Sequence, residues 1–171
     1  MALTIEARYD LSLLKVLVID DSENMLRLVK TILYALGVEQ IEQSPDGVRA
    51  YEIMGWFEPD LLICDWNMSP IDGITFTRKV RKSPDSPNPY VPIIILSGHS
   101  EKSRVTEARD AGANLFLTKP ISVKTLSDRI QMLIDNPQPF VRTECYFGPD
   151  RRRQDMGPPP GTLGRRKSDG W

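Results

Sequence analysis

Three carboxylates, a hydroxyl and an amine stand at the ends of short apolar runs that lie far apart in the sequence. The central example is Asp65, which ends an apolar run of four residues and is followed by Asn67, Pro70 and Gly73. Such a run, bounded by turn residues, is typical of a short buried strand that stops at a carboxylate. The runs and the polar residues that end them are 15–19 with Asp20 and Asp21, 61–64 with Asp65, 92–96 with Ser97, and 114–117 with Thr118 and Lys119.

These residue types suit phosphoryl chemistry beside a divalent cation. Carboxylates gathered at one place repel one another, and Mg²⁺ relieves the repulsion because it prefers carboxylate, carbonyl and water oxygens. Asp21 and Asp65, with the backbone carbonyl of Asn67, could supply three such oxygens. Asp65 could then attack a phosphorus atom as a nucleophile, while the Lys119 ammonium and the Ser97 hydroxyl share the phosphoryl oxygens.

The segments between the apolar runs have helical patterns. Ser22 is a plausible N-cap of a helix that Gly37 ends, and Ser122 caps the last helix. A weaker strand is expected at 38–43 and a polar helix at 101–111. Five strands that alternate with five helices predict an α/β fold: a doubly wound five-stranded parallel sheet of flavodoxin-like order 2-1-3-4-5. All the polar strand ends would then meet at one edge of the sheet.

Length and composition limit the number of domains and the kinds of partner. The 171 residues, 40% of them hydrophobic, can bury one core, and the net charge of -1 gives no general attraction to nucleic acid or anionic membranes. The sequence contains no apolar run of roughly 18 residues and no secretory leader, so we expect a cytoplasmic protein without a membrane span. Its two cysteines are too few for a disulfide framework.

We divide the chain into an N-terminal extension (1–12), a folded domain (13–135) and a Pro/Gly/Arg-rich tail (136–171) without its own core. The tail contains seven basic and four acidic residues, with basic runs at 151–153 (three arginines) and 165–167 (two arginines and a lysine). These runs could contact acidic proteins, RNA or phospholipid. A solvated linker is the favoured interpretation, because charge runs in such segments are usually solvated.

Together, in this order and spacing, the motifs resemble the receiver domain of two-component response regulators, of the CheY-like, stand-alone type. The resemblance covers about Leu13 to Ile134 and depends on the four segments VLVIDDS, ICDWNMSPIDG, LSG and LTKP. One departure is Ser69, which stands where the family usually has proline, and Pro70 follows it.

The resemblance implies a role for each residue at the strand ends. Asp65 would be the phosphoacceptor, supplied by a phosphohistidine on a sensor kinase or a phosphotransfer protein. Asp20 and Asp21 would hold Mg²⁺, Asp21 directly and Asp20 mostly through water. Lys119 would contact the phosphoryl group and precede a cis proline, Pro120.

Four further positions would tune or transmit the signal. Ser97 corresponds to the switch hydroxyl, and Phe116 to the aromatic switch whose rotamer follows it. Phe116 could equally be an ordinary core residue. Asn67 and His99 occupy positions that tune dephosphorylation in the family, and His99 is otherwise an exposed loop residue.

The expected function is a single-domain response regulator that switches partner binding in a phosphorelay. It would be a phosphoacceptor that assists its own phosphorylation and dephosphorylation rather than an enzyme, and its partner surface would comprise the 101–111 helix, the last strand and the last helix. One alternative is a nucleic-acid-binding regulator that acts through the basic tail. Another, an aspartyl-phosphate hydrolase, is disfavoured because Asn67 stands where its general acid would be. A degenerate receiver is disfavoured by the complete set of site residues.

Overall fold

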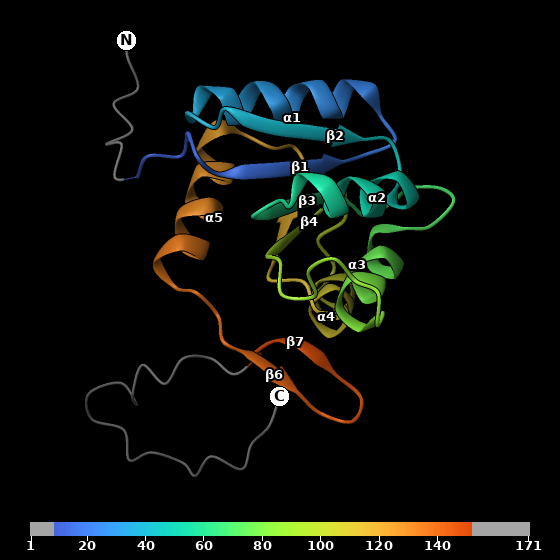
Figure 1. The fold of residues 1–171 in the computed structure, drawn as a ribbon. Helices are drawn as coiled ribbons and strands as arrows, with labels where there is room; N and C mark the ends of the chain where they lie inside the picture. The colour runs from blue at the N-terminus through green and yellow to red at the C-terminus, as the bar shows by residue number, and fades with distance from the viewer. Residues whose placement is uncertain (1–8, 152–171) are drawn as a thin grey trace, which may run out of the picture.

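A five-stranded parallel sheet forms the centre of the computed structural model, which describes residues 9–151 (Figure 1). The strands are hydrogen-bonded in the order β2-β1-β3-β4-β5, and helices alternate with them along the chain, so the predicted fold class is confirmed. The elements are β1 (Lys15–Ile19), α1 (Glu23–Ala35), β2 (Gln40–Ser44), α2 (Gly47–Phe57), β3 (Leu61–Asp65), α3 (Gly73–Lys82), β4 (Ile93–Ser97), α4 (Lys102–Ala111), β5 (Leu115–Thr118), α5 (Val123–Asp135), β6 (Phe140–Arg142) and β7 (Phe147–Pro149).

Helices cover both faces of this sheet. α1 and α5 contact each other, whereas α2 contacts α3 and α3 contacts α4. The apolar core is accordingly divided into two clusters, and successive residues of the strands alternate between them. All residues of β3 and β4 are buried, as expected for strands covered on both faces.

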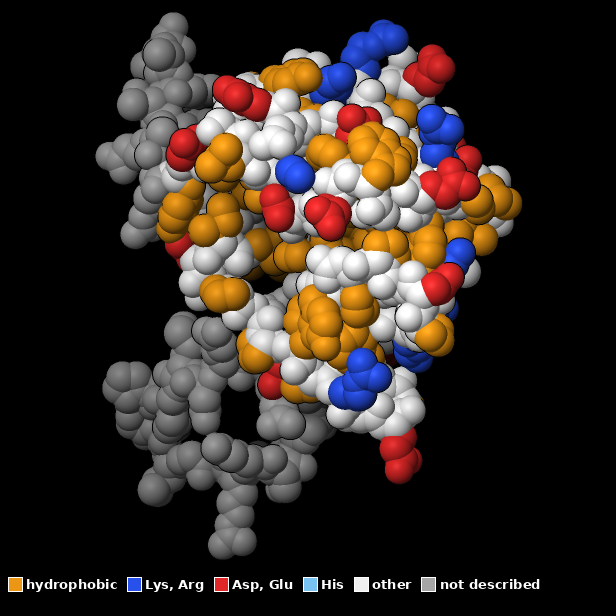
Figure 2. Space-filling view, viewed as in Figure 1, with side chains coloured by type: hydrophobic (Ala, Val, Ile, Leu, Met, Phe, Trp, Pro, Cys, Tyr) orange, Lys and Arg blue, Asp and Glu red, His pale blue; other side chains and the backbone are white. Residues whose placement is uncertain are grey.

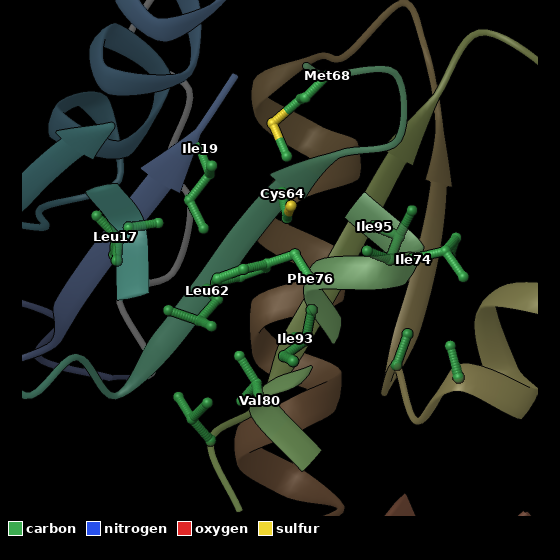
Figure 3. Close-up of a cluster of buried hydrophobic side chains, with 14 of the residues drawn as sticks. Leu17, Ile19, Leu62, Cys64, Met68, Ile74, Phe76, Val80, Ile93 and Ile95 are labelled. Carbon is green, nitrogen blue, oxygen red and sulfur yellow. The ribbon is translucent and has the colours of Figure 1, made fainter. Parts of the chain in front are cut away.

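The cluster between the sheet and helices α2, α3 and α4 packs against one face of the central strand β3. Figure 3 shows Phe76 of α3 pointing onto the strands beside Leu62 and Cys64. Phe76, Leu62 and Cys64 have no exposed surface. This packing fixes the carboxyl end of β3, where Asp65 lies.

The helix ends follow the sequence signals closely. The Ser22 side chain accepts a hydrogen bond from the Met25 amide, and Ser122 forms a reciprocal capping box with Thr125. Gly37 has a φ of +93°, in the left-handed region that favours glycine after a helix. The strand predicted at 38–43 is observed at 40–44, so it begins two residues later and ends one residue later than predicted.

Part of the segment expected to be a tail forms an antiparallel hairpin, β6–β7. Tyr146 and Phe147 are buried, and β7 contacts α3. In the face viewed in Figure 2, hydrophobic side chains gather where the loop after α3 and the hairpin meet. The hairpin therefore packs on the domain and has no separate core of its own.

Residues 1–8 and 152–171 lie outside the described residues, so most of the expected N-terminal extension and most of the two basic runs are not placed. Within residues 9–151, no helix is both long enough and apolar enough to cross a bilayer.

Candidate functional site

Asp65 lies at the carboxyl end of β3, between β1 and β4, and its side chain is buried. The chain leaves the strand through a hydrogen bond from the Trp66 amide to the Leu96 carbonyl (2.9 Å). It returns at Gly73, whose amide donates to the Trp66 carbonyl (2.8 Å). A Cβ on Gly73 would lie 2.2 Å from the Asp65 carbonyl oxygen, so only glycine lets α3 begin this close to the strand end.

Two further acids from the end of β1 meet Asp65. The carboxylate oxygens of Asp20, Asp21 and Asp65 lie within 4.8 Å of one another, with Asp20 buried and Asp21 exposed. Asp20 is held by the backbone, because its amide donates to the Ser44 carbonyl and its Oδ1 accepts from the Ser22 amide. The expected convergence of acids from two strand ends is therefore observed.

Lys119 brings a positive charge to the same place. Its Nζ lies 2.8 Å from Asp65 Oδ1 and 3.6 Å from Asp20 Oδ2. The Lys119 amide donates to the Ser97 carbonyl (2.8 Å), which ties the end of β5 to β4. The Lys119–Pro120 peptide bond is cis, as the resemblance implied, and so is the Ser69–Pro70 bond.

The electrostatics of this cluster are finely balanced. Burial raises the pKa of the Asp20 carboxyl, and the nearby charge of Asp65 raises it further. The hydrogen bond from the Ser22 amide and the charge of Lys119 lower this pKa, but they do not outweigh burial. Burial alone would lower the pKa of Lys119, but its hydrogen bond to Asp65 and the charges of Asp65 and Asp20 outweigh burial and raise it. Lys119 therefore holds its proton firmly, whereas burial of Asp20 disfavours the charged form of its carboxyl.

The donor set fits Mg²⁺. Asp20 Oδ2 is buried and accepts no hydrogen bond within the described residues, since Lys119 Nζ lies 3.6 Å away, and it faces two other carboxylates. Three oxygen donors at a sheet edge, one of them exposed to solvent, match a cation that keeps several waters. Asp20, Asp21 and Asp65 are the side chains that would hold it.

The remaining residues singled out from the sequence lie around this cluster. Ser97 is buried at the end of β4, and its Oγ accepts from the His99 amide (3.1 Å). Asn67 and His99 are exposed, and His99 Nδ1 lies 3.7 Å from Glu101. Phe116 of β5 is half-buried against the core cluster beneath α3 and α4.

One contact was not expected from the sequence. The Trp66 ring packs edge-on against Phe116, with ring centroids 6.3 Å apart, and the Arg104 guanidinium of α4 lies 4.7 Å from the Trp66 ring centroid. Trp66, which follows Asp65 directly in the chain, thus contacts both β5 and α4. A single arginine on a polar helix gives no sequence signal for such a contact.

Comparison with known proteins identifies this arrangement. A family model described as the response regulator receiver domain matches residues 16–131. The chain belongs to this family. The receiver domain is 34% identical over 122 residues to chemotaxis protein CheY1 of Helicobacter pylori, which covers 71% of this chain and 97% of that protein. It is 29% identical, with the same coverage, to chemotaxis protein CheY of Pseudomonas aeruginosa.

Solved structures agree with this assignment. The receiver domain matches Vibrio cholerae chemotaxis protein CheY4 with a TM-score of 0.64 and 30% identity, over 69% of this chain and 96% of that one. A Francisella response regulator receiver domain matches with a TM-score of 0.64 and 30% identity, over 71% of this chain and 96% of that one. The family match ends at residue 131, so the β6–β7 hairpin lies beyond it.

Family membership gives the general function. The chain is a response regulator of two-component signalling, in a class that acts as a phosphoacceptor switch rather than as a conventional enzyme. A receiver domain works with a histidine kinase or phosphotransfer donor on one side and a downstream target on the other.

Proposed function

We propose that Asp65 accepts a phosphoryl group from a phosphohistidine donor and that the resulting acyl phosphate changes the affinity of the domain for a partner protein. The observation that carries this proposal is the 2.8 Å contact between Lys119 Nζ and Asp65 Oδ1 inside a cluster of three carboxylates. An ion pair alone would not need two further acids beside it. We also propose that the protein acts in the cytoplasm, as expected from its sequence.

The transfer uses groups that lie around Asp65. A carboxylate oxygen of Asp65 attacks phosphorus, an O–P bond forms, and the P–N bond of the donor breaks with its electron pair passing to the imidazole nitrogen. Lys119 stabilises the charge that develops on the phosphoryl oxygens. When bound by Asp20, Asp21, Asp65 and the backbone carbonyl of Asn67, Mg²⁺ neutralises part of the carboxylate charge, so that an anionic donor can approach.

Release of the group restores the carboxylate. Water attacks phosphorus, the O–P bond breaks, and inorganic phosphate leaves. Asn67 is exposed in the loop after Asp65, and His99 is exposed in the loop after β4. From these positions they tune the access of that water to the phosphoryl group. The domain thereby assists both its own phosphorylation and its dephosphorylation.

Ser97 and Phe116 convert the charge into a change of surface. An acyl phosphate carries a charge of about -1.5 to -2, compared with -1 for the carboxylate that it replaces. The Ser97 hydroxyl turns toward the phosphoryl oxygens and draws the loop after β4 inward, and Phe116 takes up the space released. The partner surface made by α4, β5 and α5 then differs between the two states, and only that difference in affinity transmits the signal.

The test is phosphorylation of the full chain by a small phosphodonor such as acetyl phosphate with Mg²⁺, followed by intact-mass measurement. We expect wild type, but not Asp65→Asn, to gain the mass of one phosphoryl group. Emission of Trp66 should change in parallel, because its ring contacts both Phe116 and Arg104. Replacing Trp56 and Trp171 by phenylalanine assigns the emission to Trp66, since the chain has three tryptophans.

Lys119→Ala tests the contact between Lys119 Nζ and Asp65 Oδ1, because it removes the amine and leaves the three carboxylates in place. It should be phosphorylated slowly while still folding, because Lys119 is only partly buried. Equal mass gain in wild type and Asp65→Asn would contradict the assignment of Asp65. No mass gain in either protein with Mg²⁺ present would contradict the proposed function itself.

A further inference from the structure

The hairpin beyond the family match packs through aromatic rings. Tyr90, Phe140 and Phe147 form a cluster with ring centroids 5.3 to 5.7 Å apart. Tyr90 comes from the loop after α3, and the two phenylalanines come from the two strands of the hairpin. Edge-to-face aromatic packing of this kind stabilises a contact beyond the area that it buries.

A buried arginine lies under this cluster. Arg81, near the end of α3, is 2% exposed and donates to the carbonyls of Gly112 (2.9 Å), Pro89 (2.9 Å) and Val91 (2.7 Å). Its guanidinium lies 4.9 Å from the Phe140 ring centroid. The hairpin therefore covers a cation that already joins the end of α3 to the end of α4.

Two glycines, Gly112 and Gly148, bring the hairpin backbone close to the end of α4. A Cβ on Gly148 would lie 3.0 Å from the Cα of Gly112 and 2.6 Å from the Tyr146 hydroxyl. A Cβ on Gly112 would lie 3.2 Å from the Phe147 carbonyl oxygen. The hairpin backbone is thus seated directly on the backbone that ends α4, with no space for a side chain between them.

Beyond β7, the chain is also tied to α4. Arg151 forms an ion pair with Asp110, which lies in the last turn of α4. The Arg151 guanidinium lies 4.2 Å from the Tyr146 ring centroid. These contacts hold Arg151, the last described residue, against the C-terminal end of α4.

α4 is held mainly at this end. Its buried residues are Ala108 and Ala111, both in its second half, and its N-cap residue Glu101 makes no side-chain hydrogen bond to the helix. The first half follows directly from Ser97 and the loop 98–101. A helix with so few buried apolar contacts is among the least stable parts of a fold.

We propose that the β6–β7 hairpin is an intramolecular clamp on the C-terminal end of α4, and that the docked clamp opposes the phosphorylated state. This inference rests on the proposed function. A shift of α4 relative to α3 has to open the Gly112–Gly148 contact, because that contact has no slack. Docking and phosphorylation are then linked, and each weakens the other by the same factor.

Gly148→Ala is the variant that tests the clamp, because its Cβ has no room and Gly148 has no positive φ to confuse the result. Gly55→Ala is the matched control, since a Cβ there meets nothing within 4 Å. The full chain is titrated with beryllofluoride, a phosphoryl analogue, at fixed Mg²⁺ while Trp66 emission is recorded. We expect Gly148→Ala to reach half-saturation at a concentration lower than wild type by roughly fivefold or more, with Gly55→Ala unchanged.

Hydrogen exchange measures the reverse effect. The amide of Thr143 donates to the Tyr146 carbonyl (2.8 Å) and the amide of Asp150 to the Pro139 carbonyl (2.6 Å), both within the hairpin. Because a two-stranded hairpin is at best marginally stable on its own, these hydrogen bonds should open more often once the hairpin leaves the domain. Beryllofluoride should accelerate their exchange in wild type but not in Asp65→Asn.

A second set of variants avoids the hairpin backbone. Arg151→Glu should lower the half-saturating concentration, and adding Asp110→Arg should restore it. Equal half-saturation for wild type, Gly148→Ala and Arg151→Glu, or unchanged exchange, would overturn the clamp while leaving phosphorylation of Asp65 intact. If wild type neither binds beryllofluoride nor gains mass from acetyl phosphate, the proposed function and the clamp fail together.

Discussion

Replacing Gly73 by alanine should damage both the stability and the chemistry of the receiver domain. The added Cβ would lie 2.2 Å from the Asp65 carbonyl oxygen, 3.1 Å from the Asp65 carbonyl carbon and 3.2 Å from Trp66 Cα. Because real Cβ atoms stay beyond 3.0 Å, the start of α3 must move away by nearly an ångström. The clash is with backbone in a fully buried strand, so no flexible side chain can relieve it.

The cost follows from this displacement. Overpacking a well-packed core costs about 1 to 3 kcal/mol, and a clash with backbone belongs at the upper end of that range. About 3 kcal/mol corresponds to a fall of roughly 6 to 12 °C in the thermal midpoint for a domain of this size. Because the clashing atom is the Asp65 carbonyl oxygen, the displacement also reaches Asp65, and a misplacement of about 1 Å there should slow phosphorylation by about 100-fold.

Thermal unfolding by circular dichroism and the rate of mass gain with acetyl phosphate measure the two effects. Gly55→Ala is the control, because it adds the same atom to open space within α2 and should stabilise by about 0.5 to 1 kcal/mol. A Gly73→Ala midpoint within 2 °C of wild type, with a normal phosphorylation rate, would refute the argument that this close approach positions Asp65.

Two further predictions concern charge. Mg²⁺ at ten times its dissociation constant should stabilise wild type by about 1.4 kcal/mol, seen as a higher thermal midpoint, whereas Asp20→Asn should lose most of that shift. An equal Mg²⁺ response in both proteins would contradict the expected role of Asp20 in binding the metal. Without metal, Asp20→Asn should melt at a higher temperature than wild type, because burial raises the pKa of the Asp20 carboxyl and its charged form therefore lowers the stability at neutral pH. Burial also raises the pKa of Tyr146 above its usual 10, so the stability it gives is present below pH 10 and is lost as the pH rises through the higher, folded value. Midpoints between pH 9 and 11 should therefore fall less steeply in Tyr146→Phe, since Tyr51 and Lys119 titrate in the same direction in both proteins; parallel slopes would contradict the prediction.

The sheet could be predicted because each buried strand is a separate apolar run that ends at a polar residue. β3 and β4 are buried on both faces, and strands of this kind have nearly continuous apolar sequences, which is the pattern seen in both. The edge strand β2 is half-buried and mixes polar with apolar residues, so its predicted start differs by two residues and its predicted end by one. The meeting of Asp20, Asp65 and Lys119 followed from topology alone, because parallel strands end at one edge.

The hairpin could not be predicted in the same way. Its aromatic residues are scattered among prolines, glycines and charges, and they form no periodic pattern. Their partners are Tyr90, Arg81 and Gly112, which lie tens of residues earlier in the chain. An arginine at the polar end of a helix, such as Arg81, also gives no sign that four acceptors will bury it. Contacts of this kind depend on tertiary structure and leave no local signal.

The distribution of burial also explains why α4, rather than another helix, would respond to Asp65. Three carboxylates and one ammonium sum to a charge of -2, and an acyl phosphate makes the site more negative by up to about one unit. That change acts on every element at this edge of the sheet. α1 resists it because Leu26, Val29, Ile32 and Leu33 are buried, whereas α4 is held by two alanines and the hairpin. Under the proposed clamp, the same electrostatic force would move the helix with the smallest apolar anchor, and the strength of the hairpin contact would decide how far.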